Sequence, residues 1–368
     1  MEEPRSIVTV TPHGEVGREI SIEDNICKEE SCDRSKFALL AEPSPTSKDE
    51  INAMLEIESS HYRPPRNYLA FDSCKSGVNE NWRRRLCEWM FEVTDHYDFD
   101  REVVSYAFDY LDRSIALAYG PTAKKKLSKR EYQLYAVTSL YLAIKVHGEM
   151  DSDVDGKRIK LRISAFQELS RGCFKTETIE AMEIHFLTLF QWRINPPTCA
   201  RFIYSYLHLL PDWKSMEFES SREDIVCQIF DVAKYLTELS IFVSDIGFNY
   251  TPSKIGYSAI LCAFDYVEEC IKGVPLNIKV RFLLSIKDVS SDLTPDCEDI
   301  RCLVTMLKKL APKMFTNHNF HHPLPRIVSL LQVAPDKSVV SASRSISPIA
   351  TGTDIVGTDE PERKRQKI

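Results

Sequence analysis

Residues 82–93 read WRRRLCEWMFEV, and this stretch decides the fold class. Its apolar residues Leu86, Trp89, Met90 and Val93 recur at spacings of three and four, so they share one face of an α-helix. The same period returns along much of the chain, whereas the alternation typical of a half-buried strand is nearly absent. The sequence therefore predicts an all-α protein.

Nine further segments carry this period. We expect a second helix to be capped by Asp100, and a third to begin at Ser128, which has capping-box spacing to Glu131. A short fourth helix is expected around Phe166, and a fifth is expected to have Thr176 as its N-cap. Five more helices are predicted at residues 198–210, 223–243, 251–270, 278–289 and 294–314.

The motif Asn195-Pro196-Pro197 separates the two series, because proline ends a helix. We therefore predict two tandem five-helix domains, the first of which carries a charged insert at residues 151–160. The expected segments are an N-terminal disordered tail at 1–48, a lead-in helix and loop at 49–79, domains at 80–197 and 198–315, and a linker with a disordered tail at 316–368.

Composition argues against several classes of protein. The chain has 368 residues, 12 of them Gly and 11 Cys, and a net charge of −7. No apolar run approaches the roughly 18 residues of a membrane span, and the N-terminus lacks a signal-peptide pattern, so we expect a soluble intracellular protein. The odd number of cysteines without a C-x-x-C pair favours reduced thiols, and no metal or cofactor is expected. The negative charge argues against general nucleic-acid binding.

Three charged residues of the first domain fall where the helical period places apolar ones. They are Asp112 in the second helix, Lys145 in the third and Glu183 in the fifth. A buried carboxylate without a partner costs several kcal/mol, so each charge needs an opposite one from its own domain or from another protein. Arg83 is the expected partner of Asp112. The alternative is that the helix rotation errs by one residue and all four side chains are solvated.

These segments together resemble the cyclin box. Residues 82–93 are similar to its first helix, and YLDR at 110–113 is similar to a motif of its second helix. The third-helix motif corresponds to AIK at 143–145, and the fifth-helix motif to Met182-Glu183. The order and spacing match over about residues 80–197.

The flanking segments resemble cyclins less closely. Residues 54–55 and YRPPRNY at 62–68 are similar to the lead-in helix and loop of D-type cyclins. The second repeat is similar to the C-terminal cyclin fold in pattern, chiefly at YLTELS, residues 235–240. The chain has no L-x-C-x-E motif, so binding of a retinoblastoma-type pocket protein is not expected.

The resemblance implies a non-catalytic regulatory subunit that binds and activates a cyclin-dependent serine/threonine protein kinase and controls cell-cycle progression. It implies that Lys145 and Glu183 bind the kinase, with Arg83 and Asp112 as a buried ionic support. The alternative is a cyclin-fold, transcription-associated factor that binds polymerase machinery or DNA. Such a factor would need a basic face.

The resemblance also implies a substrate-docking patch for partners with an Arg-x-Leu motif. Its expected members are Trp82, Leu86, Trp89, Glu92 and Gln133. Here Arg84 and Arg85 replace small or apolar residues, and a like charge opposes the ligand's arginine. The alternative is that Leu86 and Trp89 belong to the core.

Catalytic sequence motifs for phosphate loops, zinc proteases and serine hydrolases are absent from the chain, so we do not expect an enzyme. An all-α enzyme would need a pocket of titratable groups. The candidates for such a pocket are Lys145, Glu183 and Asp112, and the resemblance already gives each of them another role. The cluster Arg363, Lys364, Arg365 and Lys367 favours a nuclear import signal, with a merely solvated terminus as the alternative. We therefore expect the protein in nucleus and cytoplasm, with the nucleus favoured.

Overall fold

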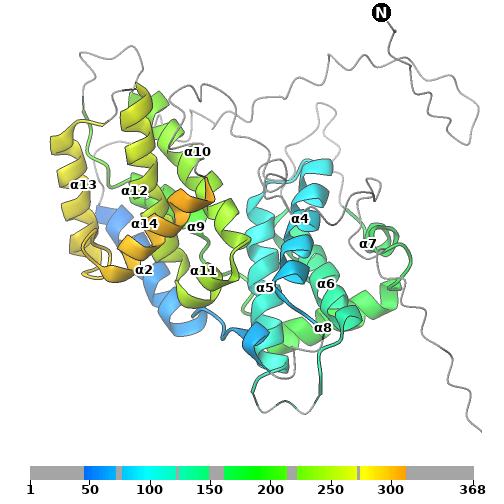
Figure 1. Ribbon diagram of the computed structural model, residues 1–368. Helices are drawn as coiled ribbons and strands as arrows, with labels where there is room; N and C mark the ends of the chain where they lie inside the picture. The colour runs from blue at the N-terminus through cyan, green and yellow to red at the C-terminus, as the bar shows by residue number, and fades with distance from the viewer. Residues whose placement is uncertain are drawn as a thin grey trace, which may run out of the picture. The chain divides into compact units, whose positions relative to one another are not determined.

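A computed structural model gives the fold (Figure 1). It describes residues 45–71, 77–121, 123, 125–148, 161–213, 222–271 and 274–311. Every regular element in these ranges is helical. The elements are α2 (Pro45–His61), η1 (Tyr68–Ala70), α4 (Glu80–His96), α5 (Glu102–Ala118), α6 (Lys129–His147), α7 (Ile163–Leu169), α8 (Thr176–Leu189), α9 (Cys199–Leu207), α10 (Arg222–Ile241), α11 (Ser244–Asn249), α12 (Pro252–Ile271), α13 (Leu276–Val289) and α14 (Glu298–Leu310).

The helices α4, α7 and α8 pack around α5 and α6. Figure 1 shows α4, α5 and α6 side by side, and α8 also contacts both α5 and α6. The stripe predicted on α4 is core, because Leu86, Trp89 and Met90 are all buried. Local signals begin the helices: Asn79 accepts a hydrogen bond from the backbone nitrogen of Trp82.

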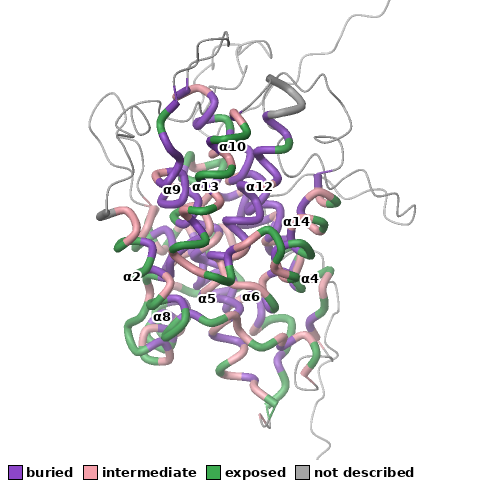
Figure 2. Tube along the Cα trace, turned by 90° about the vertical axis from the view of Figure 1, so that its left-hand side faces the viewer, coloured by how far each residue is buried: buried purple, intermediate pink, exposed green. Residues whose placement is uncertain are grey.

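The second group is built on α12, which packs against α9, α10 and α14. Buried residues, purple in Figure 2, run along α9 and α12. The helices α9 and α12 approach closely at Gly256, where an added Cβ would lie 3.0 Å from the carbonyl oxygen of Cys199. A larger residue at this position would push the two helices apart.

The structure confirms the all-α class, with five predicted helices on each side of the proline motif. The capping box of Ser128 and Glu131 is complete. The prediction that Thr176 caps its helix was wrong, because Lys175 is the N-cap and Thr176 is the first helical residue. The six-residue helix α11 was not predicted, and α14 is shorter than expected at both ends.

The predicted segment boundaries have different outcomes. The domain boundary at 197/198 falls between α8 and α9 and stays a prediction. The helix α2 begins at Pro45, so it overlaps the last residues of the segment 1–48 that was expected to be a tail. The other tail residues, the 151–160 insert and the basic cluster at 363–367 lie outside the described residues.

Two further properties bear on the function. Among the described residues, none of the helices combines the length and apolarity that a membrane span needs. Seven cysteines whose side chains the structure describes are free thiols, namely Cys87, Cys173, Cys199, Cys227, Cys262, Cys297 and Cys302.

Candidate functional site

The interior of the first helix group holds an ion pair between α4 and α5. A guanidinium nitrogen of Arg83 lies 2.8 Å from a carboxylate oxygen of Asp112, and their side chains are 2% and 7% exposed. Tyr68 donates a second hydrogen bond to this carboxylate at 2.9 Å, and the Tyr132 hydroxyl lies 3.1 Å from that of Tyr68. The charge that the sequence places on a core face thus has partners from within the chain.

Arg83 also joins the two helix groups. Its other terminal nitrogen donates to the carbonyl oxygen of Ile241, the last residue of α10, at 2.5 Å. The guanidinium lies over the rings of Phe108, at 4.8 Å, and Phe248, at 5.6 Å. Burial is the largest single effect and lowers the pKa of Arg83, but the charge of Asp112, the hydrogen bond to it and the nearby Tyr68 and Tyr132 together leave the pKa raised. Arg83 is therefore an internal support that stays charged.

A second ion pair lies at the surface, between the last turn of α6 and the middle of α8. The ammonium nitrogen of Lys145 is 2.7 Å from a carboxylate oxygen of Glu183. The Lys145 side chain is 52% exposed and that of Glu183 only 10%. The prediction that Lys145 lies on the core face of its helix was wrong, because the last turn of α6 carries it out into solvent. The hydrogen bond to Glu183 raises the pKa of Lys145, which stays a cation with donors left for another acceptor.

Two apolar side chains of the same two segments, the end of α6 and the residues after α8, are exposed. Val146 follows Lys145, and Trp192 follows α8 and is 72% exposed. The backbone of Trp192 is left-handed, with φ of 64°, which is uncommon for a bulky residue. Large exposed apolar side chains beside polar ones mark surfaces that bind other proteins.

His147 joins the end of α6 to the residues that follow α8. Its ring stacks on Tyr106 at 3.6 Å, and its Nε2 lies 2.9 Å from the Tyr110 hydroxyl and 3.1 Å from the carbonyl oxygen of Ile194. These contacts tie the end of α6 to the segment that follows α8. Burial lowers the pKa of His147, which favours its neutral form. Val146 and Trp192 each lie within two residues of this junction.

Sequence reasoning missed Val146, His147 and Trp192 as candidate site residues. The available signal was the position of Trp192, which is apolar but comes after the last stripe residue of its helix, Phe190. Its exposure follows from the left-handed turn at residues 191–192, which the helical period does not predict.

The five residues of the predicted docking patch do not form an exposed apolar surface. Leu86 and Trp89 are each 1% exposed, so both belong to the core, as the alternative interpretation had it. Gln133 is also buried. Trp82 and Glu92 are half-buried. The docking role itself stays a prediction.

The charged groups of the candidate site form ion pairs. The described part of the chain holds no group of three or more His, Cys, Asp or Glu side chains placed to bind a metal ion. Of the two ion pairs, that of Arg83 and Asp112 is internal and that of Lys145 and Glu183 lies at the surface.

Comparison with known proteins shows which proteins parts of this chain are similar to. Residues 49–195 match the model of the cyclin N-terminal domain. Putative cyclin-A3-1 of Arabidopsis thaliana is 26% identical over 230 residues, which cover 62% of this chain and 56% of that protein. Cyclin-D3-1 of Oryza sativa subsp. japonica is 26% identical over 254 residues, or 66% of this chain and 67% of the relative. The chain is therefore similar to cyclins, and its residues 49–195 match the N-terminal domain of that family.

These matches cover only part of the length of each relative. The chain spans about half the length of several relatives, for example 48% of the G2/mitotic-specific cyclin-A of Hydra viridissima. Among solved structures, a viral cyclin from herpesvirus saimiri is similar with a TM-score of 0.48 and 15% identity, over 73% of this chain and 96% of the viral one.

Proposed function

We propose that this chain is a non-catalytic regulatory subunit that binds and activates a cyclin-dependent serine/threonine protein kinase and thereby controls cell-cycle progression. The observation that carries the proposal is the surface pair of Lys145 and Glu183, with exposed Val146 next to Lys145 in the sequence and exposed Trp192 after α8. The match of residues 49–195 to the cyclin N-terminal domain supports the same assignment.

The charges of this surface fit a partner with charges of both signs. Lys145 offers unused ammonium donors, and Glu183 has one carboxylate oxygen that does not bond Lys145. A partner helix with a carboxylate and a basic side chain satisfies both groups. Pairs that become desolvated at an interface fix its register and give it specificity.

The apolar side chains supply the binding free energy. An exposed tryptophan is a frequent anchor in protein interfaces, because it buries a large area with little loss of side-chain freedom. Trp192 and Val146 are in this position. The buried Arg83–Asp112 pair supports the surface from within by linking α4, α5 and α10.

Activation follows if the surface binds only one of two positions of a kinase helix. Binding then shifts the kinase population toward that position, to the extent of the difference in affinity. The cyclin needs no reactive group of its own for this effect. The basic cluster at residues 363–367 supports a nuclear location for the complex.

The test is a phosphorylation assay with the full chain and co-purified kinase. We expect the chain alone to transfer no phosphate, and its addition to stimulate the kinase. Lys145→Glu should abolish the stimulation, while Lys287→Glu on the exposed face of α13 should preserve it. Phosphate transfer by the chain alone, or stimulation that Lys145→Glu leaves unchanged, would contradict the proposal.

A further inference from the structure

A cluster of cations surrounds the beginnings of α4, α6 and α8. We call Arg84, Arg85, Lys129, Arg130 and Lys175 the basic surface. All five are exposed, and within the described ranges none of them forms a salt bridge. The chain as a whole has a net charge of −7, so this concentration of positive charge is local.

The first half of the basic surface lies over an aromatic ring. The ammonium of Lys129, at the start of α6, is 5.4 Å from the centroid of the Trp82 ring on α4. Arg85 lies three residues after Trp82, and so on a neighbouring position of the same helix face. Trp82 is half-buried, which leaves part of its ring available to a ligand.

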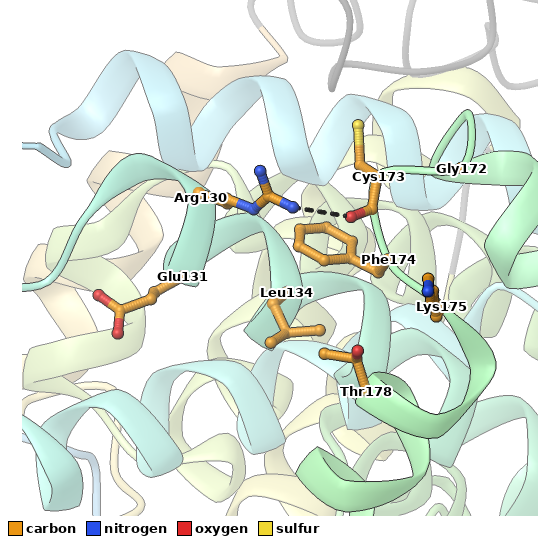
Figure 3. Close-up of a pocket in the computed structure, with 8 residues that line it drawn as sticks. All are labelled: Arg130, Glu131, Leu134, Gly172, Cys173, Phe174, Lys175 and Thr178. Atoms are coloured by element: carbon orange, nitrogen blue, oxygen red, sulfur yellow. Dashed lines mark hydrogen bonds between the residues drawn. The ribbon is translucent and has the colours of Figure 1, made fainter. Parts of the chain in front are cut away.

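The second half lines a shallow cavity of about 390 Å³ (Figure 3). Arg130 is held at one wall, where it donates a hydrogen bond to the carbonyl oxygen of Cys173 at 3.1 Å and lies 5.7 Å from the Phe174 ring. Figure 3 shows Lys175 across from Arg130, with the Phe174 ring between them and Leu134 below the ring. The cavity thus offers two cations and an apolar floor.

The acidic residues nearby do not neutralise these cations. The carboxylate of Glu131 points away from Arg130 in Figure 3, and it is engaged by Lys125 and by the backbone and hydroxyl of Ser128. Burial raises the pKa of Glu88, while the charge of Arg84 lowers it. The basic surface therefore keeps a positive potential.

We propose that the basic surface binds an acidic peptide segment that carries an apolar residue. Carboxylates of the segment pair with Arg85 and Lys129, another enters the cavity between Arg130 and Lys175, and the apolar residue packs on Trp82. The charges match such a segment and repel a basic Arg-x-Leu one. A nucleic acid is also an anion, but the net charge of −7 and the apolar floor favour a peptide. The inference concerns the chain alone and does not depend on kinase binding.

The probe is a fluorescently labelled peptide rich in Asp and Glu with one Leu, titrated with the full chain in an anisotropy assay. We expect saturable binding that weakens at least about tenfold in Arg85→Glu/Lys175→Glu. Both residues are exposed, so the variant should fold, and Arg85→Gln/Lys175→Gln should lose an intermediate amount of binding. The matched control is Arg281→Glu/Lys287→Glu on α13, which changes the net charge equally at other exposed positions.

The control should bind within about twofold of the unmodified chain. An equal loss in the control would show a general charge effect and overturn the site. Tighter binding of an Arg-x-Leu peptide would also overturn it. So would tighter binding of a single-stranded oligonucleotide of the same charge, which would assign the surface to nucleic acid.

Discussion

The carboxylate of Glu58 on α2 accepts two hydrogen bonds from Ser253 at the start of α12, 195 residues further along the chain. The backbone nitrogen of Ser253 lies at 2.9 Å and its hydroxyl at 2.5 Å. The helix preceding the first domain therefore caps a helix of the second group, and α2 also packs against α9 and α13. This contact makes α2 part of the second helix group rather than a loose lead-in.

Glu58→Ala should lower the free energy of unfolding by about 1–3 kcal/mol, because it leaves the buried backbone N–H of Ser253 without an acceptor. Urea denaturation of the full chain measures the change. Glu56→Ala is the matched control, since Glu56 is exposed on the same helix, and it should change stability by less than about 0.5 kcal/mol. Equal effects of the two substitutions would mean that the cap adds nothing.

Arg83→Ala should destabilise the fold by roughly 3–5 kcal/mol, because it strands the buried carboxylate of Asp112. It also removes the hydrogen bond to Ile241 between the helix groups. Thermal unfolding compares this variant with Arg84→Ala, the exposed neighbour, which should be nearly neutral. An Arg83→Ala variant as stable as the unmodified chain would contradict the internal-support role.

Glu238 on α10 gives the fold a pH dependence. Burial raises its pKa from 4.5 to about 7, although Lys234 and Arg101 lower it and Asp100 and Asp95 add to the rise. Because the folded-state pKa exceeds the unfolded one, the folded chain binds more protons between these values. Its contribution to the free energy of unfolding is therefore largest below about pH 4.5 and falls as the pH rises to about 7.

Glu238→Gln should remove this contribution, which we expect to be on the order of 1–3 kcal/mol. Urea denaturation of both proteins across this pH range measures it as the change in their stability difference. A difference that stays constant with pH, or that changes in the opposite direction, would show that ionisation of Glu238 does not cost stability.

Deleting residues 363–368 should reduce nuclear accumulation without weakening kinase binding, because the basic cluster is far in sequence from the charged surface pair. Imaging of a fluorescent fusion measures nuclear accumulation, and co-purification of the kinase measures kinase binding. A nuclear fraction equal to that of the complete chain would leave the cluster without an import role.

The parts of the fold that depend on local signals could be predicted from the sequence. The stripe on α4 and the capping box at Ser128 involve residues within one helix, whose spacing alone fixes their geometry. The helix α11 is only six residues long, too short for a period to be recognised. The Arg83–Asp112 pair could be predicted because both residues lie on core faces of predicted helices.

Other parts of the site depend on contacts that the sequence does not encode locally. Glu58 and Ser253 are joined by the packing of distant helices, and spacing does not indicate such a pair. Trp192 became exposed through a left-handed turn without glycine. Lys145 and Glu183 were expected to need partners, but spacing alone left open whether they pair with each other or with another protein.

The central claim is that Lys145 and Glu183 contact a kinase in addition to each other. Charge reversal of either should weaken kinase binding at least about thirtyfold, or about 2 kcal/mol, because the kinase's opposing groups lose their partners. Either reversal also breaks the internal pair, so a loss of binding alone does not separate the two roles.

The most direct test is therefore the exchanged variant Lys145→Glu/Glu183→Lys, whose kinase affinity and melting temperature are measured beside those of both single variants. The exchange restores an internal ion pair in reversed orientation, so the melting temperature should recover relative to the single variants. We predict that affinity for the kinase stays at least about thirtyfold below that of the unmodified chain, because both charges facing the kinase are still reversed. Recovery of kinase affinity together with the melting temperature would show that the pair supports only the fold of the chain itself, and would contradict the proposed interface.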